Sequence, residues 1–158
     1  MNTFKALFLI LVLALSAFGI SGTPVPELEG SWRVKEAKDS GEPVKEINDL
    51  LTIRGNIFER VTPVHTFIRV LKIDATKDPA WIDLHVANEP GKGEVFLGIY
   101  EQHGDYLKIC HARPGRPRPT EFSSTPENRQ ILSVSRRVGP LMVWVRGVPT
   151  KASSPMGL

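Results

Sequence analysis

Cysteine is almost absent from this chain. Cys110 is the only one among 158 residues, so an internal disulfide is excluded and stability has to come from packing. A single cysteine in an apolar stretch is expected to be a buried, unreactive side chain. Strong charge is also lacking: the net charge is +3, and the basic residues are spread along the chain, which gives no footprint for nucleic acid. Nothing in this composition indicates a metal-rich, disulfide-stapled or nucleic-acid-binding protein.

One long hydrophobic run is present, at residues 6–20, and Lys5 is the only charged side chain before Glu27. The run has about 15 residues, the length of the apolar part of a secretory signal and less than the roughly 20 that span a membrane. We predict a signal peptide over residues 1–22 and an extracytoplasmic product, periplasmic or secreted. Cleavage is expected after Gly19 or Gly22. An uncleaved N-terminal anchor, which would hold the protein at a membrane, is the alternative.

The remaining chain, about 136 residues, has the size of one domain. We predict a domain over residues 28–137 and a C-terminal tail over residues 138–158. In the tail, residues 141–145 favour one further strand, and the last residues, 150–158, have the composition of a disordered end.

The apolar residues of the domain occur in short stretches that alternate with polar residues or are β-branched. A single helical turn is expected at residues 45–50, and Gly55 and Asn56 are expected to form a tight turn. Gly98 inside a strand favours the bend that a closed barrel needs. The pattern predicts an all-β antiparallel barrel or sandwich. The strands are expected at residues 31–38, 51–54, 57–61, 64–73, 81–86, 94–101, 106–111 and 130–136.

Gly30, Trp32 and Arg136 are the predicted closure of the barrel. The Gly-x-Trp at the first strand resembles the lipocalin-like (calycin) barrels, in which the tryptophan fills the closed end and an arginine of the last strand lies over its ring. A large ring suits the narrow base of an eight-stranded barrel, and a guanidinium over an indole stabilises it further. Arg136 was preferred over Arg137 because it alternates in register with Leu132 and Val134.

A longer resemblance covers residues 28–137. The segments LEGSW, GEPV, PAWIDL, GKG, LGIYE, GDYLKIC and RPTEF occur in this order. They resemble an uncharacterised lipocalin-like domain family that is best known from planctomycete bacteria. The resemblance implies a small calycin barrel and export, and the family has no established activity. His111 departs from the pattern, because an aromatic or other apolar residue is usual after Cys110, and it places a polar group near the barrel interior or rim.

Two groups of side chains are the candidate sites. The predicted ligand cavity consists of apolar residues expected inside the barrel, namely Val34, Phe67, Trp81, Phe96, Ile99, Leu107 and Ile109. The predicted polar cluster at the rim consists of His111, Arg116, Arg118 and Glu121. The cluster either binds an anion or is a structural lock, in which Glu121 pairs with an arginine and Phe122 enters the core.

No catalytic, metal or cofactor motif is evident in the sequence. We therefore predict a monomeric, non-enzymatic binding module for a small apolar or amphipathic ligand, without a cofactor. The alternative is a solid-core envelope protein that acts on protein partners through residues 113–119 and 141–145. An enzyme would need a polar site around His111 or Glu121.

Overall fold

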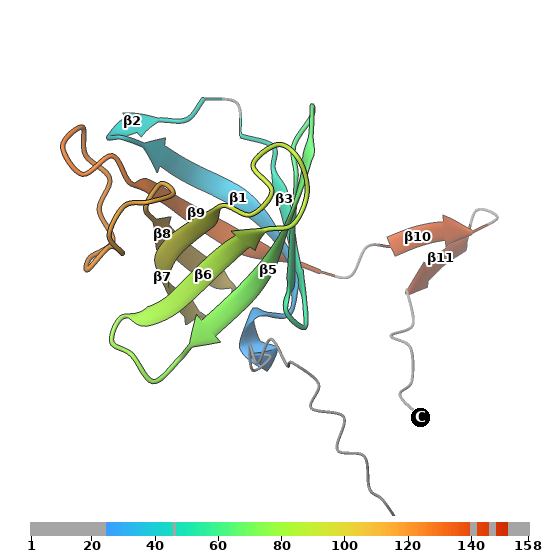
Figure 1. Cartoon of the computed structure of the whole chain (residues 1–158). Coiled ribbons are helices and arrows are strands. Elements are labelled where there is room, and N and C mark those ends of the chain that lie inside the picture. Colours follow the sequence, from blue (N-terminus) through green and yellow to red (C-terminus); the bar gives the residue numbers. More distant parts are fainter. Residues whose placement is uncertain (1–24, 46, 140–141, 146–147, 152–158) are drawn as a thin grey trace, which may run out of the picture.

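The computed structural model describes residues 25–45, 47–139, 142–145 and 148–151. In this part of the chain, eight strands of an antiparallel sheet follow one another in sequence order, and the last pairs with the first; a short further strand, Glu42–Pro43, pairs with the first strand alone. The sheet closes into an eight-stranded lipocalin-like barrel (Figure 1), as predicted. The elements are η1 (Pro26–Leu28), β1 (Gly30–Asp39), β2 (Glu42–Pro43), β3 (Leu50–Arg54), β4 (Ile57–Val61), β5 (Thr66–Asp74), β6 (Ala80–Val86), β7 (Val95–His103), β8 (Tyr106–His111), β9 (Ile131–Val138), β10 (Met142–Val145) and β11 (Val148–Lys151).

Several details differ from the predictions. The turn at Gly55 and Asn56 joins β3 to β4 as expected, but the described residues of the segment 45–50 form no helix. The two strands of the tail, β10 and β11, pair as a hairpin in a sheet of their own. The predicted signal peptide, its cleavage sites and the very end of the tail lie outside the described residues. Among those described, no helix is long and apolar enough to cross a membrane.

The closed end of the barrel is built around Trp32. Its side chain is fully buried, and its indole Nε1 donates a hydrogen bond to the carbonyl of Leu28, 2.9 Å away. Leu28 belongs to the short helix η1, which lies below the barrel in Figure 1. Because the indole N–H is satisfied by this helix, a large polar-edged ring can be buried there at little cost.

Arg137, not Arg136, lies over this ring, so the predicted partner was wrong. The Arg137 guanidinium carbon is 3.9 Å from the ring centroid, whereas Arg136 is exposed and lies over Tyr106. The register explains the difference, since Arg137 faces Trp32 on β1. The inward residues of β9 are therefore Ser133, Ser135 and Arg137, and the more apolar alternate set faces outward.

Gly30 is confirmed as part of the closure. It has a φ of +123°, and a side-chain carbon added there would lie 2.9 Å from Nη1 of Arg137. A glycine is therefore needed both for the backbone conformation and for the close approach of the guanidinium. Arg137 also donates to the carbonyls of Glu27 and Glu29, which fastens η1 beneath the barrel.

The core packs around Trp32 and fills this part of the interior. A bulge in β1 between Val34 and Glu36 changes the alternation, so Ala37 packs against the core and Glu36 is exposed. The buried members of the core are Leu28, Trp32, Val34, Leu51, Ile53, Phe58, Leu71, Ile82, Leu84, Tyr100, Leu107 and Ile109.

Candidate ligand-binding mouth of the barrel

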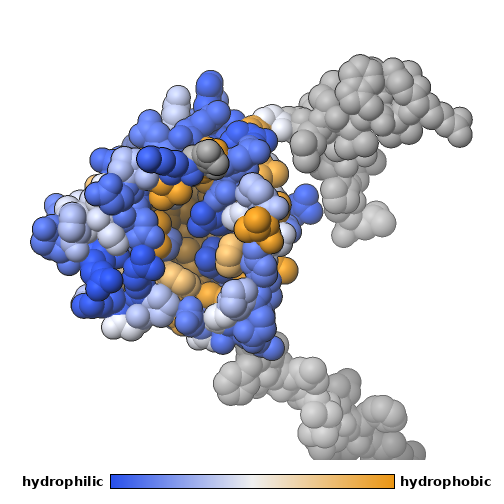
Figure 2. Space-filling view, turned by 90° about the horizontal axis from the view of Figure 1, so that it is seen from above, coloured by the Kyte–Doolittle hydropathy of each residue, from blue (hydrophilic) through white to orange (hydrophobic). Residues whose placement is uncertain are grey.

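The end of the barrel opposite η1 is open. Figure 2 looks down on this end and shows a hollow in which hydrophobic residues are visible, ringed by hydrophilic ones. We call its inward-facing side chains the mouth: Arg60 on β4, Phe67 and Arg69 on β5, Phe96 on β7 and His111 on β8. They lie on the same face of the sheet as the core residues beneath them, because side chains alternate along each strand.

Arg69 is the most unusual side chain of the mouth. It pairs in register with Phe58 and Val86, both buried, and only 8% of its surface is exposed. Its guanidinium carbon lies 5.8, 5.4 and 5.3 Å from the ring centroids of Phe58, Phe67 and Phe96. Within the described residues, its Nε atom is buried without a hydrogen-bond partner. Burial, and then the charge of Arg60, lower the pKa of Arg69 to about 10, so the side chain stays protonated at neutral pH.

Arg60, the second arginine of the mouth, has a partner. Its Nη2 and Nε atoms lie 2.5 and 2.7 Å from Oδ2 of Asp49, a buried residue just before β3. This two-point contact matches one positive charge with one negative charge and holds the guanidinium in place. The charge of Arg69 has no such match among the described residues.

His111 is the third basic group of the mouth. It is buried, its ring meets that of Phe96 edge-on at 5.3 Å, and its Nδ1 atom is 3.4 Å from the carbonyl of Ala112. Burial, followed by the charge of Arg69, lowers the pKa of His111 from 6.5 to about 4. The ring is therefore neutral at pH 7. The expectation that His111 places a polar group in the interior is confirmed.

The stability of the protein, relative to a His111→Phe variant, is expected to fall as the pH is lowered from 6.5 to 4. In this window the unfolded chain binds a proton at His111 and the folded protein does not, so acid favours unfolding. The pKa shift corresponds to a loss of about 3 kcal/mol in the free energy of unfolding at pH 4. Above pH 6.5 His111 makes no pH-dependent contribution to this free energy. Urea denaturation of both proteins across this range measures it. Parallel pH profiles would contradict the burial of a neutral His111.

The predicted cavity residues divide into three groups. Phe67 and Phe96 line the mouth as expected. Val34, Leu107 and Ile109 face the interior but belong to the packed core, where no more than 5% of each is exposed. Trp81 and Ile99 are on the outer face of the barrel, so their assignment to a cavity was wrong.

The outward position of Trp81 and Ile99 follows from the register. They pair with each other, Ile99 pairs with Cys110, and the adjacent inward row contains Ile82 of the core. This outer row is apolar because residues 112–130, which we call the strap, cover it. The Cys110 thiol donates to the carbonyl of Ser123 in the strap at 3.3 Å, and burial raises its pKa to about 11. The cysteine is thus buried, as predicted, and its raised pKa disfavours the reactive thiolate.

Arg118 anchors the strap. Its guanidinium carbon is 4.2 Å from the Trp81 ring centroid, and its Nη1 atom lies 2.6 Å from both Oδ1 of Asp83 and the carbonyl of Gly98. Asp83 Oδ1 is buried and has no hydrogen bond among the described residues, so its pairing with Arg118 is electrostatic. Gly98 itself has no room for a side chain, since an added carbon would lie 2.9 Å from the carbonyl of Cys110 and 3.1 Å from Cβ of His111, which faces the interior.

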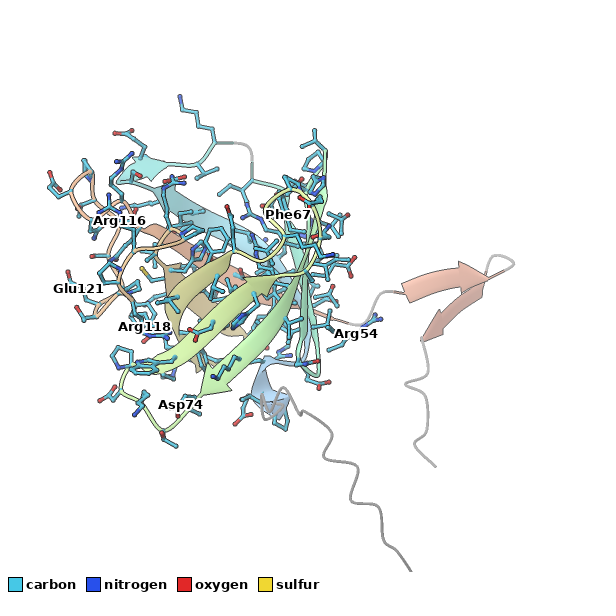
Figure 3. The ribbon with its side chains drawn as sticks, viewed as in Figure 1. Arg54, Phe67, Asp74, Arg116, Arg118 and Glu121 are labelled. Atoms are coloured by element: carbon cyan, nitrogen blue, oxygen red, sulfur yellow. The ribbon has the colours of Figure 1, made fainter. Side chains whose placement is uncertain are left out.

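The predicted rim cluster does not assemble. His111 faces the interior, whereas Arg116, Arg118 and Glu121 belong to the strap on the opposite side of the barrel from Phe67 (Figure 3). Arg116 and Glu121 are exposed, and Glu121 accepts a hydrogen bond from Ser123 rather than pairing with an arginine. The structural lock exists, but Arg118 and Asp83 form it.

Phe122 also differs from the lock hypothesis. It is only partly buried, and the ammonium of Lys108 lies 5.1 Å from its ring centroid on the outside of the barrel. It therefore does not enter the core.

Sequence reasoning missed Arg60, Asp49 and Arg69. In β5, one alternating set contains Phe67, Arg69, Leu71 and Ile73, and the other Thr66, Ile68, Val70, Lys72 and Asp74. Each set has one basic residue, so alternation did not show which set faces inward. The available signal was that the set with the arginine is otherwise apolar and contains the aromatic residue.

A second concavity, a groove of about 500 Å3, lies outside the closed end between η1 and the turns below β5–β8. Two of its charged side chains already have partners. Lys77 lies over the ring of Trp81, and Glu101 pairs with Lys108. The mouth, where a buried charge has no counterpart among the described residues, is therefore the stronger candidate for a binding site.

The described residues contain no group of three His, Cys, Asp or Glu side chains that is arranged to hold a metal ion. No protein-family model, no curated protein and no solved structure matches the chain. The fold and the mouth nevertheless define a class: a small lipocalin-like barrel that is filled at one end and open, with a buried arginine, at the other.

Proposed function

We propose that this protein is a non-enzymatic binding module that takes a small apolar or amphipathic ligand into the mouth of its barrel. The single observation that carries the proposal is Arg69, a buried charge ringed by phenylalanines on the inner face of the barrel, at its open end. Apolar walls with a few convergent polar groups are typical of small-molecule sites. Because the core fills the other end, the ligand is short.

We further propose that the module acts outside the cytoplasm. Support comes from the hydrophobic run at residues 6–20, which ends shortly before the barrel begins. The single cysteine, Cys110, is buried, which is compatible with an oxidising compartment. The ordered motifs between residues 28 and 137 support membership of the planctomycete lipocalin-like family.

The alternative, a protein that acts through its surface, is favoured by one observation. A groove of about 240 Å3 beside β1 and β9 is lined by the apolar residues Ala37, Pro43, Val44, Ile47, Leu132 and Val134, together with Lys35, Glu36 and Lys38. Loss of ligand binding in the test below, together with capture of a protein partner that depends on Val44, would favour this alternative.

The test of the proposal uses a fluorescent apolar probe, N-phenyl-1-naphthylamine. The probe is neutral, so its binding does not require an ion pair with Arg69. Saturable binding of one probe per chain is expected. Phe67→Ala and Phe96→Ala should each weaken it roughly fivefold or more, because about 1 kcal/mol of apolar contact is lost. Phe122→Ala is the matched control, since Phe122 lies outside the barrel.

Two outcomes count against a binding mouth. One is the absence of saturable binding by the unaltered protein. The other is an equal loss of affinity in Phe122→Ala and in the mouth variants, which would place the probe elsewhere. Circular dichroism of each variant checks that the barrel is folded.

A further inference from the structure

We infer that the ligand of the mouth is a monoanionic carboxylic acid with a short apolar body, whose carboxylate binds the guanidinium of Arg69. This inference rests on the proposed function and specifies the chemical class of the ligand. Four features of the mouth support it: the unmatched donors of Arg69, the phenyl rings around it, the balance of charge, and the packed floor beneath it.

The donors of Arg69 have no acceptor among the described residues. A guanidinium carries five N–H donors, and buried polar groups in folded proteins nearly always have partners. Among the described residues, Arg69 has neither a carboxylate nor a carbonyl partner, and its Nε atom is completely buried. An arginine that is held inside a barrel without an acceptor indicates that the acceptor comes from outside.

The phenyl rings around Arg69 do not replace that acceptor. Phe58, Phe67 and Phe96 attract the positive charge through their π-electron faces, at 5.3–5.8 Å, but they offer no lone pair to the N–H groups. The fork of an arginine matches the two oxygens of a carboxylate, and the rings supply apolar surface for the rest of the ligand. The mouth therefore suits a molecule with an acidic end and an apolar body.

The charges of the mouth indicate a single negative charge on the ligand. Arg60 is matched by Asp49, and Asp39, at the end of β1, is matched by Arg113 at 2.7 Å. His111 is neutral at pH 7. Among the described residues of the mouth, one positive charge, that of Arg69, is left, and it balances a carboxylate rather than a doubly charged phosphate ester.

The packed floor sets the orientation and the length. Phe58 and Leu71, which lie next to Arg69 on β4 and β5, are at most 3% exposed and belong to the core. These core residues lie below the guanidinium, so the carboxylate enters first and the apolar body lies between Phe67, Phe96 and the rim. A medium-chain or arylalkyl acid meets these limits, and a long-chain lipid would extend into solvent.

The experiment compares three ligands of equal chain length by isothermal titration calorimetry: octanoate, octanol and octyl phosphate. The purified full chain should bind octanoate at least tenfold more tightly than octanol, the effect of a charge-assisted two-point hydrogen bond. Octyl phosphate should bind no more tightly than octanoate. In Arg69→Met the preference for octanoate over octanol should fall to less than about twofold, while octanol still binds.

Arg54→Met is the matched control, because Arg54 is exposed at the end of β3 beside the turn at Gly55 (Figure 3). It should keep the full preference for the acid. Arg69→Lys is the second variant for the case in which Arg69→Met does not fold. It retains the charge without the fork and should keep a weaker preference for octanoate than the unaltered protein.

The outcomes separate the inference from the proposed function. Equal affinity of the unaltered protein for octanoate and octanol would overturn the carboxylate assignment and leave the binding mouth standing. Tighter binding of octyl phosphate than of octanoate would overturn the single-charge argument. An unchanged preference in Arg69→Met or Arg69→Lys would remove Arg69 from the site. If neither the C8 ligands nor the naphthylamine probe binds, the proposed function fails, and the inference fails with it.

Discussion

Replacement of Trp32 by alanine is expected to destabilise the protein by about 3–5 kcal/mol. The indole is fully buried at the base of the barrel, it donates a hydrogen bond to the carbonyl of Leu28, and Arg137 lies 3.9 Å above its ring. Its removal leaves a cavity, an unsatisfied carbonyl and a guanidinium without its aromatic partner. Equilibrium denaturation in urea measures the change in the free energy of unfolding.

Two further variants show whether the loss comes from closure of the barrel. Trp81→Ala is the matched tryptophan control, because Trp81 is 38% exposed on the outer face, and a smaller loss is expected. Arg137→Met should cost about 1–2 kcal/mol, the cation–π contribution together with the bonds to η1. A loss of less than 1 kcal/mol in Trp32→Ala would contradict its role as the plug.

Trp32 and the barrel were predictable from the sequence because strong, local signals specify them. Short alternating stretches and a turn at Gly55 predict antiparallel strands in sequence order, and Gly-x-Trp marks the first. The choice between Arg136 and Arg137 was not local. It depended on which face of β9 is inward, and the apolar set, with Leu132 and Val134, is the outer one. Small serines face the interior instead, where Ser133 and Ser135 leave room for larger neighbours.

The errors at Trp81 and Ile99 have a related physical cause. A strand that is buried on both faces shows apolar residues in both alternating sets, so its pattern does not say which set lines the interior. β7 is such a strand, because the core covers one face and the strap covers the other. The strap has no regular secondary structure, so its contact with β6–β8 was not visible in any periodicity.

The mouth was beyond sequence reasoning for another reason. Arg69, Phe58, Phe96 and His111 lie on four strands, and only closure of the barrel brings them together. No spacing rule links these positions along the chain. A buried arginine without a partner also departs from the rule that charges face water, and such departures are typical of functional sites.

Arg118→Met is expected to cost about 3 kcal/mol and to release the strap. The substitution removes the cation–π contact with Trp81 and the hydrogen bond to Gly98, and it leaves the buried carboxylate of Asp83 without a counter-charge. Urea denaturation measures the global loss, and hydrogen exchange of residues 112–130 measures local opening. Arg116→Met is the control, since Arg116 is exposed in the same segment and should cost less than about 0.5 kcal/mol.

A double variant distinguishes an ion-pair lock from simple packing. The double variant Arg118→Met/Asp83→Leu lacks the carboxylate that Arg118→Met leaves without a partner. The double variant should therefore be more stable than Arg118→Met alone. If the two losses instead add, Arg118 contributes through its contacts with Trp81 and Gly98, and the charge of Asp83 is irrelevant. The sign of this coupling energy shows whether the charge of Asp83 matters. If hydrogen exchange of residues 112–130 in Arg118→Met is the same as in the unaltered protein, Arg118 does not hold the strap on the barrel.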